Sequence, residues 1–225
     1  MDRKTDIRRD SRPASPELFR DENEKANLEA KNGLRQFDEV LRLIDEATKH
    51  GALFRLRPST MQGLHRIAIE GIYTCAGNYR NHPVYIAGTS HEPPPWQQVA
   101  AEVEACCDYV DDNWNQSPIH LSAYLMWRIN WIHPFSGGNG RTSRAVSYLT
   151  LCARLGYRLP GTLTIPEQIV SNRQPYYQAL DAADLAWSRG VVDVSVMEQL
   201  LDRMLATQLV QVHAAAVSGP HTRLS

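Results

Sequence analysis

A glycine-rich loop lies between two strongly apolar helical patterns near the middle of the chain. The loop spans residues 132–144 and contains one histidine, three glycines, one asparagine and two arginines. Apolar residues recur at helical spacing over residues 121–131 before it and over residues 145–155 after it. We therefore expect two buried helices joined by a tight loop, inside a mainly helical domain.

The composition of this loop is typical of a site that binds phosphate. The first turn of a helix presents unpaired backbone N–H groups and a partial positive charge. Gly138 and Gly140 lack a Cβ atom, so an anion can approach the backbone closely. Arg141 and Arg144 are three residues apart and share one helix face. Two guanidinium groups beside such a turn suit several linked phosphates.

His133 stands at the other end of the same loop. Histidine is the usual side chain for removing a proton from a hydroxyl near neutral pH. A base beside a polyphosphate site indicates phosphoryl or nucleotidyl transfer. A single histidine or glycine-rich turn is more often structural, so this interpretation depends on the whole string.

Residues 133–144 read His-Pro-Phe-Ser-Gly-Gly-Asn-Gly-Arg-Thr-Ser-Arg. This string resembles the signature of the Fic (filamentation induced by cAMP) domain of the Fic/DOC superfamily, His-Pro-Phe-x-(Asp/Glu)-Gly-Asn-Gly-Arg-x-x-Arg. Only Gly137 departs from it, because the family has an acidic residue there. The resemblance extends over residues 51–180. It implies an all-α, Fic-type helical bundle with a small β-hairpin flap. It also implies a protein adenylyltransferase, which transfers AMP from ATP to a hydroxyl side chain of a target protein.

The resemblance further implies a role for each residue of the loop. His133 is the expected catalytic base, and Phe135 is expected to support the loop from beneath. The expected phosphate-binding residues are Gly138, Asn139 and Gly140 for the α-phosphate, Arg141 for the β-phosphate and Arg144 for the γ-phosphate.

Gly137 leaves the metal and the activity open. In the family the acidic residue at this position holds Mg²⁺, so we predict no metal ligand in the protein and expect Mg²⁺ to arrive mainly with ATP. Three outcomes follow: slower AMP transfer, use of another nucleotide or a CDP-linked donor, or a nucleotide- or target-binding module with little activity. A hydrolase or kinase is less favoured, because the Gly-Asn-Gly-Arg form resembles the nucleotidyl-transfer branch. A metal site at His120 and His133 is not favoured, because no third ligand has a recognisable spacing.

Two further segments carry candidate binding residues. Residues 77–88 have a turn-prone centre between short β-prone runs, which predicts a small hairpin. By resemblance this hairpin is the flap that holds the target, with Val84, Tyr85 and Ile86 as candidate contacts; the alternative is a plain surface hairpin. Tyr176 and Tyr177 either stack on the base of the nucleotide or pack in the core.

Many Fic domains carry an inhibitory helix with the pattern Ser/Thr-x-x-x-Glu-Gly/Asn, whose glutamate pairs with the second arginine of the signature. Glu22 precedes Asn23 here but has Leu18 four residues before it, and Glu29 is followed by alanine. Neither fits the pattern. The sequence therefore does not support built-in inhibition. A glutamate of the first helix that reaches Arg144 and a separate, antitoxin-like protein are the routes that stay open.

The domain boundaries follow from composition and periodicity. Residues 1–22 are charged and contain two prolines, so we expect a flexible arm. Residues 23–215 form the helical domain, with a core at about 51–180 and a last helix at about 194–213, and residues 216–225 form a flexible tail. Other helical patterns cover residues 15–49, 60–73 and 96–114.

Charge and cysteine content indicate which partners and which cellular compartment to expect. A net charge of −1 argues against binding to nucleic acid or to a membrane surface, and no apolar run is long enough to span a bilayer. The four cysteines have no C-x-x-C spacing, which favours free thiols in a cytoplasmic protein. The expected partner is a target protein with a Ser, Thr or Tyr hydroxyl, and the oligomeric state stays open.

Overall fold

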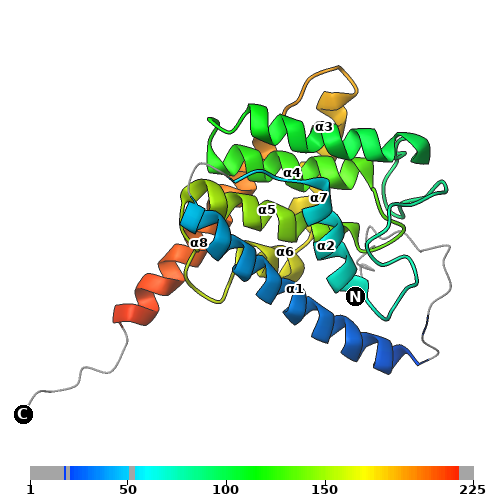
Figure 1. Cartoon of the computed structure of the whole chain (residues 1–225). Coiled ribbons are helices and arrows are strands. Elements are labelled where there is room, and N and C mark those ends of the chain that lie inside the picture. Colours follow the sequence, from blue (N-terminus) through cyan, green and yellow to red (C-terminus); the bar gives the residue numbers. More distant parts are fainter. Residues whose placement is uncertain (1–17, 19–20, 51–53, 218–225) are drawn as a thin grey trace, which may run out of the picture.

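The structure is a computed structural model that describes residues 18, 21–50 and 54–217. The described residues form helices and connecting loops without a β-strand (Figure 1). The helices are α1 (Glu22–His50), α2 (Pro58–Ile69), the 3₁₀ turn η2 (Trp96–Gln98), α3 (Val99–Asp112), α4 (Pro118–Ile132), α5 (Asn139–Leu155), α6 (Ile165–Ser171), α7 (Gln174–Trp187) and α8 (Ser195–Val217).

Helices α4 and α5 form the centre of the fold, as the two apolar patterns predicted. Ser117 caps α4 by accepting a hydrogen bond from the His120 N–H, and Pro118 occupies the first helical turn. Every residue of α4 from Leu121 to Ile129 is buried. Helix α5 begins at Asn139, six residues before its apolar pattern, and ends at Gly156 in the left-handed conformation.

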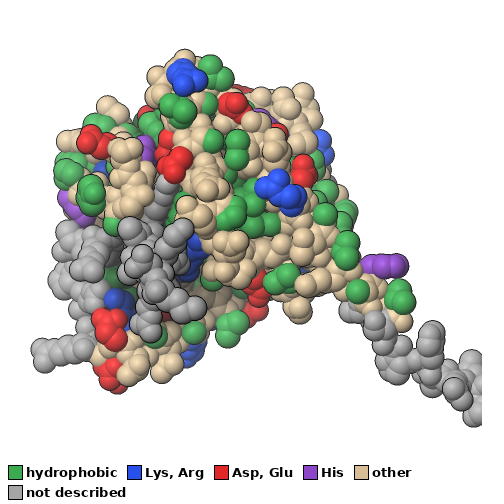
Figure 2. Space-filling view, turned by 180° about the vertical axis from the view of Figure 1, so that it is seen from behind, with side chains coloured by type: hydrophobic (Ala, Val, Ile, Leu, Met, Phe, Trp, Pro, Cys, Tyr) green, Lys and Arg blue, Asp and Glu red, His purple; other side chains and the backbone are tan. Residues whose placement is uncertain are grey.

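The other helices pack around this pair (Figure 1). Helix α1 packs against α2 and α5, α3 packs against α4, and α8 packs against α4 and α7. The last turns of α8 project away from the body of the molecule (Figure 1). On the face seen from behind, acidic, basic and apolar side chains are intermixed without a large block of one charge (Figure 2), in keeping with the net charge of −1.

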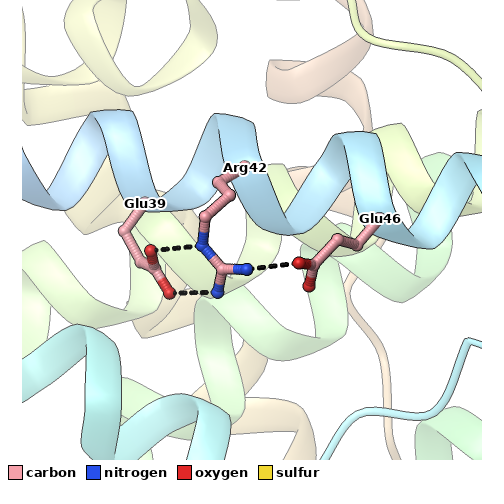
Figure 3. A network of polar contacts seen from close by, with 3 residues as sticks. All are labelled: Glu39, Arg42 and Glu46. Atoms are coloured by element: carbon pink, nitrogen blue, oxygen red, sulfur yellow. Dashed lines mark hydrogen bonds and ion pairs between the residues drawn. The ribbon is translucent and has the colours of Figure 1, made fainter.

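The outer face of α1 carries a chain of ion pairs (Figure 3). The Arg42 guanidinium donates from Nε to Glu39 Oε2 at 2.7 Å and from Nη2 to Glu39 Oε1 at 2.6 Å. Its Nη1 atom donates to Glu46 one turn further on. These exposed pairs mark the solvent side of α1 and contribute little to stability.

The predicted β-hairpin over residues 77–88 is wrong. This part of the described chain runs as irregular turns beside the loop after α4. The Arg80 N–H donates to the carbonyl of Pro134 at 2.9 Å, so the backbone pairs with the loop and not with itself. Pro83 lacks an N–H and cannot donate to a ladder, which adds to the cost of a hairpin here.

The observed helix boundaries differ from the predicted ones at both ends of the chain. The helix start predicted at Ser15 lies outside the described residues, as does most of the N-terminal arm, and α1 is seen from Glu22. The last helix runs to Val217, four residues beyond the predicted end. The four cysteines are free thiols, as predicted. No helix within the described ranges is long and apolar enough to cross a membrane.

Candidate functional site

The turn between α4 and α5 depends on two residues with positive φ. His133 ends α4 with φ 50° and ψ 58°, and it is the only non-glycine residue with positive φ in the described part of the chain. Gly138 precedes α5 with φ 75°. A Cβ atom on Gly138 would lie 3.0 Å from Ile69 Cγ2 and 3.4 Å from the His65 ring. Both the conformation and the space therefore require glycine at this position.

The Asn139 side chain stabilises the loop through two hydrogen bonds to the Phe135 backbone. Its Nδ2 atom donates to the Phe135 carbonyl at 2.8 Å, and its Oδ1 atom accepts from the Phe135 N–H at 2.9 Å. The residue is 2% exposed. The Asn139 side chain is thus committed to the shape of the loop, while its backbone N–H belongs to the first turn of α5.

Phe135 lies under the loop, as predicted, and is stacked on His65 of α2. The ring centroids are 3.7 Å apart and the rings are almost parallel, at 7°. The Gly77 N–H donates to His65 Nδ1 at 3.0 Å, which places the ring hydrogen on Nε2, 2.9 Å from the Gly137 carbonyl. Burial lowers the pKa of His65 to about 4, so the ring is neutral at pH 7.

Arg80 supports the loop where it leaves the C-terminal end of α4. Its Nε atom donates to the His133 carbonyl at 2.8 Å, and its Nη2 atom donates to the carbonyls of Pro94 at 2.5 Å and Ile132 at 3.3 Å. Arg80 is 3% exposed. It therefore satisfies the last carbonyls of α4 and fixes the backbone that carries His133. Neither Arg80 nor His65 has a sequence signal, because both act through contacts far along the chain.

His133 has the geometry of a neutral proton acceptor. Its Nδ1 atom lies 3.3 Å from the Asn130 carbonyl, which favours a hydrogen on Nδ1 and makes Nε2 the basic nitrogen. Burial, and to a smaller extent the nearby charges of Arg80 and His91, lower the pKa of His133 to about 3. The imidazole is therefore uncharged in the empty site at neutral pH.

A cavity of about 480 Å³ opens beside this loop. The predicted site residues that line it are His133, Gly138, Asn139, Gly140, Arg141, Arg144, Tyr176, Tyr177 and Ile86. The structure thus brings the predicted base and the predicted phosphate-binding residues to one hollow. Val84 and Tyr85 are not among its lining residues, and the Tyr85 side chain is 79% exposed.

Helix α1 reaches this cavity through a glutamate. Glu29 Oε1 lies 2.9 Å from Arg141 Nη2, and Arg141 Nη1 donates to the Ala68 carbonyl at 3.2 Å. The glutamate thus pairs with the first arginine of the signature and not with Arg144, the expected partner. About a third of each side chain is exposed, so the pair is accessible to water.

The two tyrosines of α7 occupy different depths of the cavity wall. Tyr176 is 2% exposed, and its hydroxyl accepts a hydrogen bond from Asn130 Nδ2 at 2.8 Å. Tyr177 is only partly buried. Tyr176 therefore packs as core, while Tyr177 is the more exposed of these two lining residues.

The described residues do not form a metal site by themselves. They contain no group of three His, Cys, Asp or Glu side chains placed to hold an ion, and Gly137 offers no carboxylate. His120 lies apart from this site, because its ring nitrogens contact Glu198 Oε1 at 2.6 Å and the Tyr109 hydroxyl at 2.9 Å. A Mg²⁺ ion held by a ring of protein ligands does not fit these residues.

Part of this chain is similar to known proteins. Residues 55–151 match the model of the Fic/DOC family. A protein adenylyltransferase Fic from Drosophila willistoni is 34% identical over 122 residues, which are 53% of this chain. A counterpart from Drosophila virilis is 33% identical over the same length. The chain spans about a fifth of the length of these curated relatives.

Solved structures show the same fold. Fic-1 from C. elegans (residues 134–508) has a TM-score of 0.63 at 22% identity, over 85% of this chain and 54% of that one. A Fic domain containing signaling protein from Bacteroides thetaiotaomicron has a TM-score of 0.62 at 19% identity, over 84% of this chain and 74% of that one. The fold is thus that of a helical, Fic-like domain. Residues 55–151 of this chain form a region that matches the Fic/DOC family.

Proposed function

We propose that this chain is a protein adenylyltransferase that transfers AMP from ATP to a Ser, Thr or Tyr hydroxyl of a target protein. One observation carries the proposal: a buried, neutral histidine and two arginines at a helix N-terminus line the same cavity. Relatives named protein adenylyltransferase support it over half of the chain.

In the proposed reaction the polyphosphate lies along the first turn of α5. Backbone N–H groups near Gly138 and Gly140 face the α-phosphate and stabilise the charge that develops there. Arg141 faces the β-phosphate and Arg144 the γ-phosphate. Tyr177 provides an apolar ring face for the base of the nucleotide. The donor brings its own Mg²⁺, because the loop has no carboxylate to hold the ion.

His133 supplies the proton transfer. Its Nε2 atom takes the proton of the target hydroxyl while the hydroxyl oxygen forms a bond to the α-phosphorus. The bond from that phosphorus to the oxygen bridging the β-phosphate breaks, and pyrophosphate leaves. The negative charge of the bound polyphosphate raises the His133 pKa above its value in the empty site, which makes the ring a better acceptor.

The test is transfer of an α-phosphate label from ATP, with Mg²⁺ and a host lysate as the pool of targets. Wild type, His133→Ala and the matched control His213→Ala are compared, since His213 lies on the exposed end of α8. We expect labelled protein with wild type and control and none with His133→Ala. Intact-mass measurement of the labelled protein should show the addition of one AMP group.

A binding module without transfer is the second candidate, and Gly137 is the observation that favours it. Such a chain would bind ATP but label no protein with ATP, GTP, CTP, UTP or CDP-choline. That result would overturn the transferase proposal. Label from CDP-choline or from another nucleotide, and not from ATP, would replace the donor and keep the site.

A further inference from the structure

A third arginine from outside the signature lines the same cavity. Arg173 directly precedes α7, whereas Arg141 and Arg144 come from the first two turns of α5. Three guanidinium groups, from α5 and from the start of α7, therefore line one hollow, together with the N-terminus of α5. Neither the apolar periodicity nor the signature predicts a role for Arg173.

The two inner arginines differ from Arg141 in their partners. Arg141 is paired with Glu29. Over the part of the chain that the structure describes, Arg144 and Arg173 have no hydrogen bond or ion pair through their side chains. Burial lowers the pKa of Arg144, and the charges of Arg173 and Arg141 lower it further. Like charges held together in a partly buried site are costly, and a multiply charged anion between them removes that cost.

The loop also has no carboxylate to hold a metal ion that would neutralise the charge of the phosphates. Mg²⁺ in proteins is usually bound through one or two carboxylates that fix it beside the phosphates. Gly137 cannot provide one, and the described residues hold no other cluster of metal-binding side chains. Neutralisation of a triphosphate in this cavity must then come more from guanidinium groups, which bind phosphate through paired N–H donors.

We propose that Arg173 is a phosphate-binding residue that holds the terminal phosphate of the donor together with Arg144. This inference rests on the proposed function, because it assumes a nucleotide in the cavity. It assigns the selectivity for a triphosphate over a monophosphate partly to a residue outside the signature. Gly137 provides no carboxylate to hold Mg²⁺ beside the phosphates, and the positive charge of Arg173 compensates for the absence of that protein-held ion.

The experiment measures binding of ATP and AMP by calorimetry, in MgCl₂ and in EDTA, with the whole chain. The variants are Arg173→Gln, Arg173→Lys and the matched control Arg189→Gln. Arg189 lies just beyond the other end of α7, is exposed and does not line the cavity. Thermal unfolding of each variant checks that the fold is intact.

We expect Arg173→Gln to weaken ATP binding by about 10-fold or more while AMP binding stays within about 2-fold of wild type. Arg173→Lys should recover part of the loss, and Arg189→Gln should match wild type. The loss should be greater in EDTA, where no Mg²⁺ shares the charge.

Two results would overturn the inference alone. The first is that Arg173→Gln binds ATP with the affinity of wild type. The second is that Arg173→Gln loses affinity for ATP and AMP equally, which would place the residue away from the terminal phosphate. If wild type binds neither nucleotide, the proposed function fails together with the inference.

Discussion

The two walls of the cavity are held in different ways. The wall that carries His133 is fixed by buried, neutral or fully satisfied groups, with Arg80 and Asn139 both at most 3% exposed. The wall formed by α1 meets the cavity through the Glu29–Arg141 pair, which is about one-third exposed. Buried hydrogen bonds are costly to break, whereas exposed ion pairs exchange readily with water. The His133 wall is therefore preorganised and the α1 wall is adjustable.

The largest effect should come from Arg80. Arg80→Leu leaves the carbonyls of Ile132, His133 and Pro94 without their donor in a buried place. We expect a loss of about 3 kcal/mol or more in the free energy of unfolding, and loss of label transfer. Urea unfolding followed by circular dichroism measures it, with Arg57→Leu at an exposed site as the control. An unchanged urea midpoint would show that the loop does not depend on Arg80.

The second effect is a loss of stability in acid. The pKa values of His65 and His133 are lowered to about 4 and about 3 in the folded state, against 6.5 in the unfolded chain. The unfolded chain therefore binds more protons below pH 6.5. Stability is intact above that pH and falls as the pH drops through it, by up to about 1.4 kcal/mol per pH unit for each histidine.

Urea unfolding between pH 7.5 and 4.5 tests this second prediction. His65→Gln should flatten the slope by about half, because one of the two buried rings no longer titrates, while the exposed control His213→Gln should not. A wild-type stability that is constant from pH 7 to pH 5 would mean that neither ring is as buried as the structure places it.

Asn139 should give the third effect. Asn139→Ala removes both hydrogen bonds to the Phe135 backbone and leaves that buried N–H and carbonyl unpaired. We expect a loss of about 2 kcal/mol in stability and at least a 10-fold fall in label transfer, because the phosphate-binding turn loses its shape. The control is Asn172→Ala at the exposed end of α6. A stable variant with full transfer would mean that the loop is held without this side chain.

The sequence predicted the parts of the site that depend on local spacing. The helices around α4 and α5, the turn at Gly138 and the clustering of His133 with both signature arginines are all local features, and all were found. The loop supports were missed, because Arg80 and His65 act on residues 53 and 72 positions away in the sequence. The hairpin over residues 77–88 failed because its backbone pairs with the loop, a tertiary contact that local β-propensity does not contain.

The contact of α1 with the cavity could not be predicted from residue spacing either, because Glu29 and Arg141 are 112 positions apart. The inhibitory pattern is absent, yet a carboxylate from α1 still pairs with Arg141, the arginine that we propose for the β-phosphate. Under that proposal, Glu29 competes with phosphate for Arg141. The competition is weak because the pair is accessible to water.

Glu29→Gln should therefore have the smallest effect on stability and the opposite effect on activity. We expect a change of at most about 0.5 kcal/mol in the free energy of unfolding, because the ion pair is partly exposed. Label transfer should rise about 3-fold, since Arg141 is released to the β-phosphate. Glu39→Gln is the matched control, because it loses a pair with Arg42 on the solvent face of the same helix (Figure 3), away from the cavity. Equal transfer by the two variants would show that the α1 wall is a passive cover; a rise only with Glu29→Gln would make it the adjustable side of an otherwise rigid site.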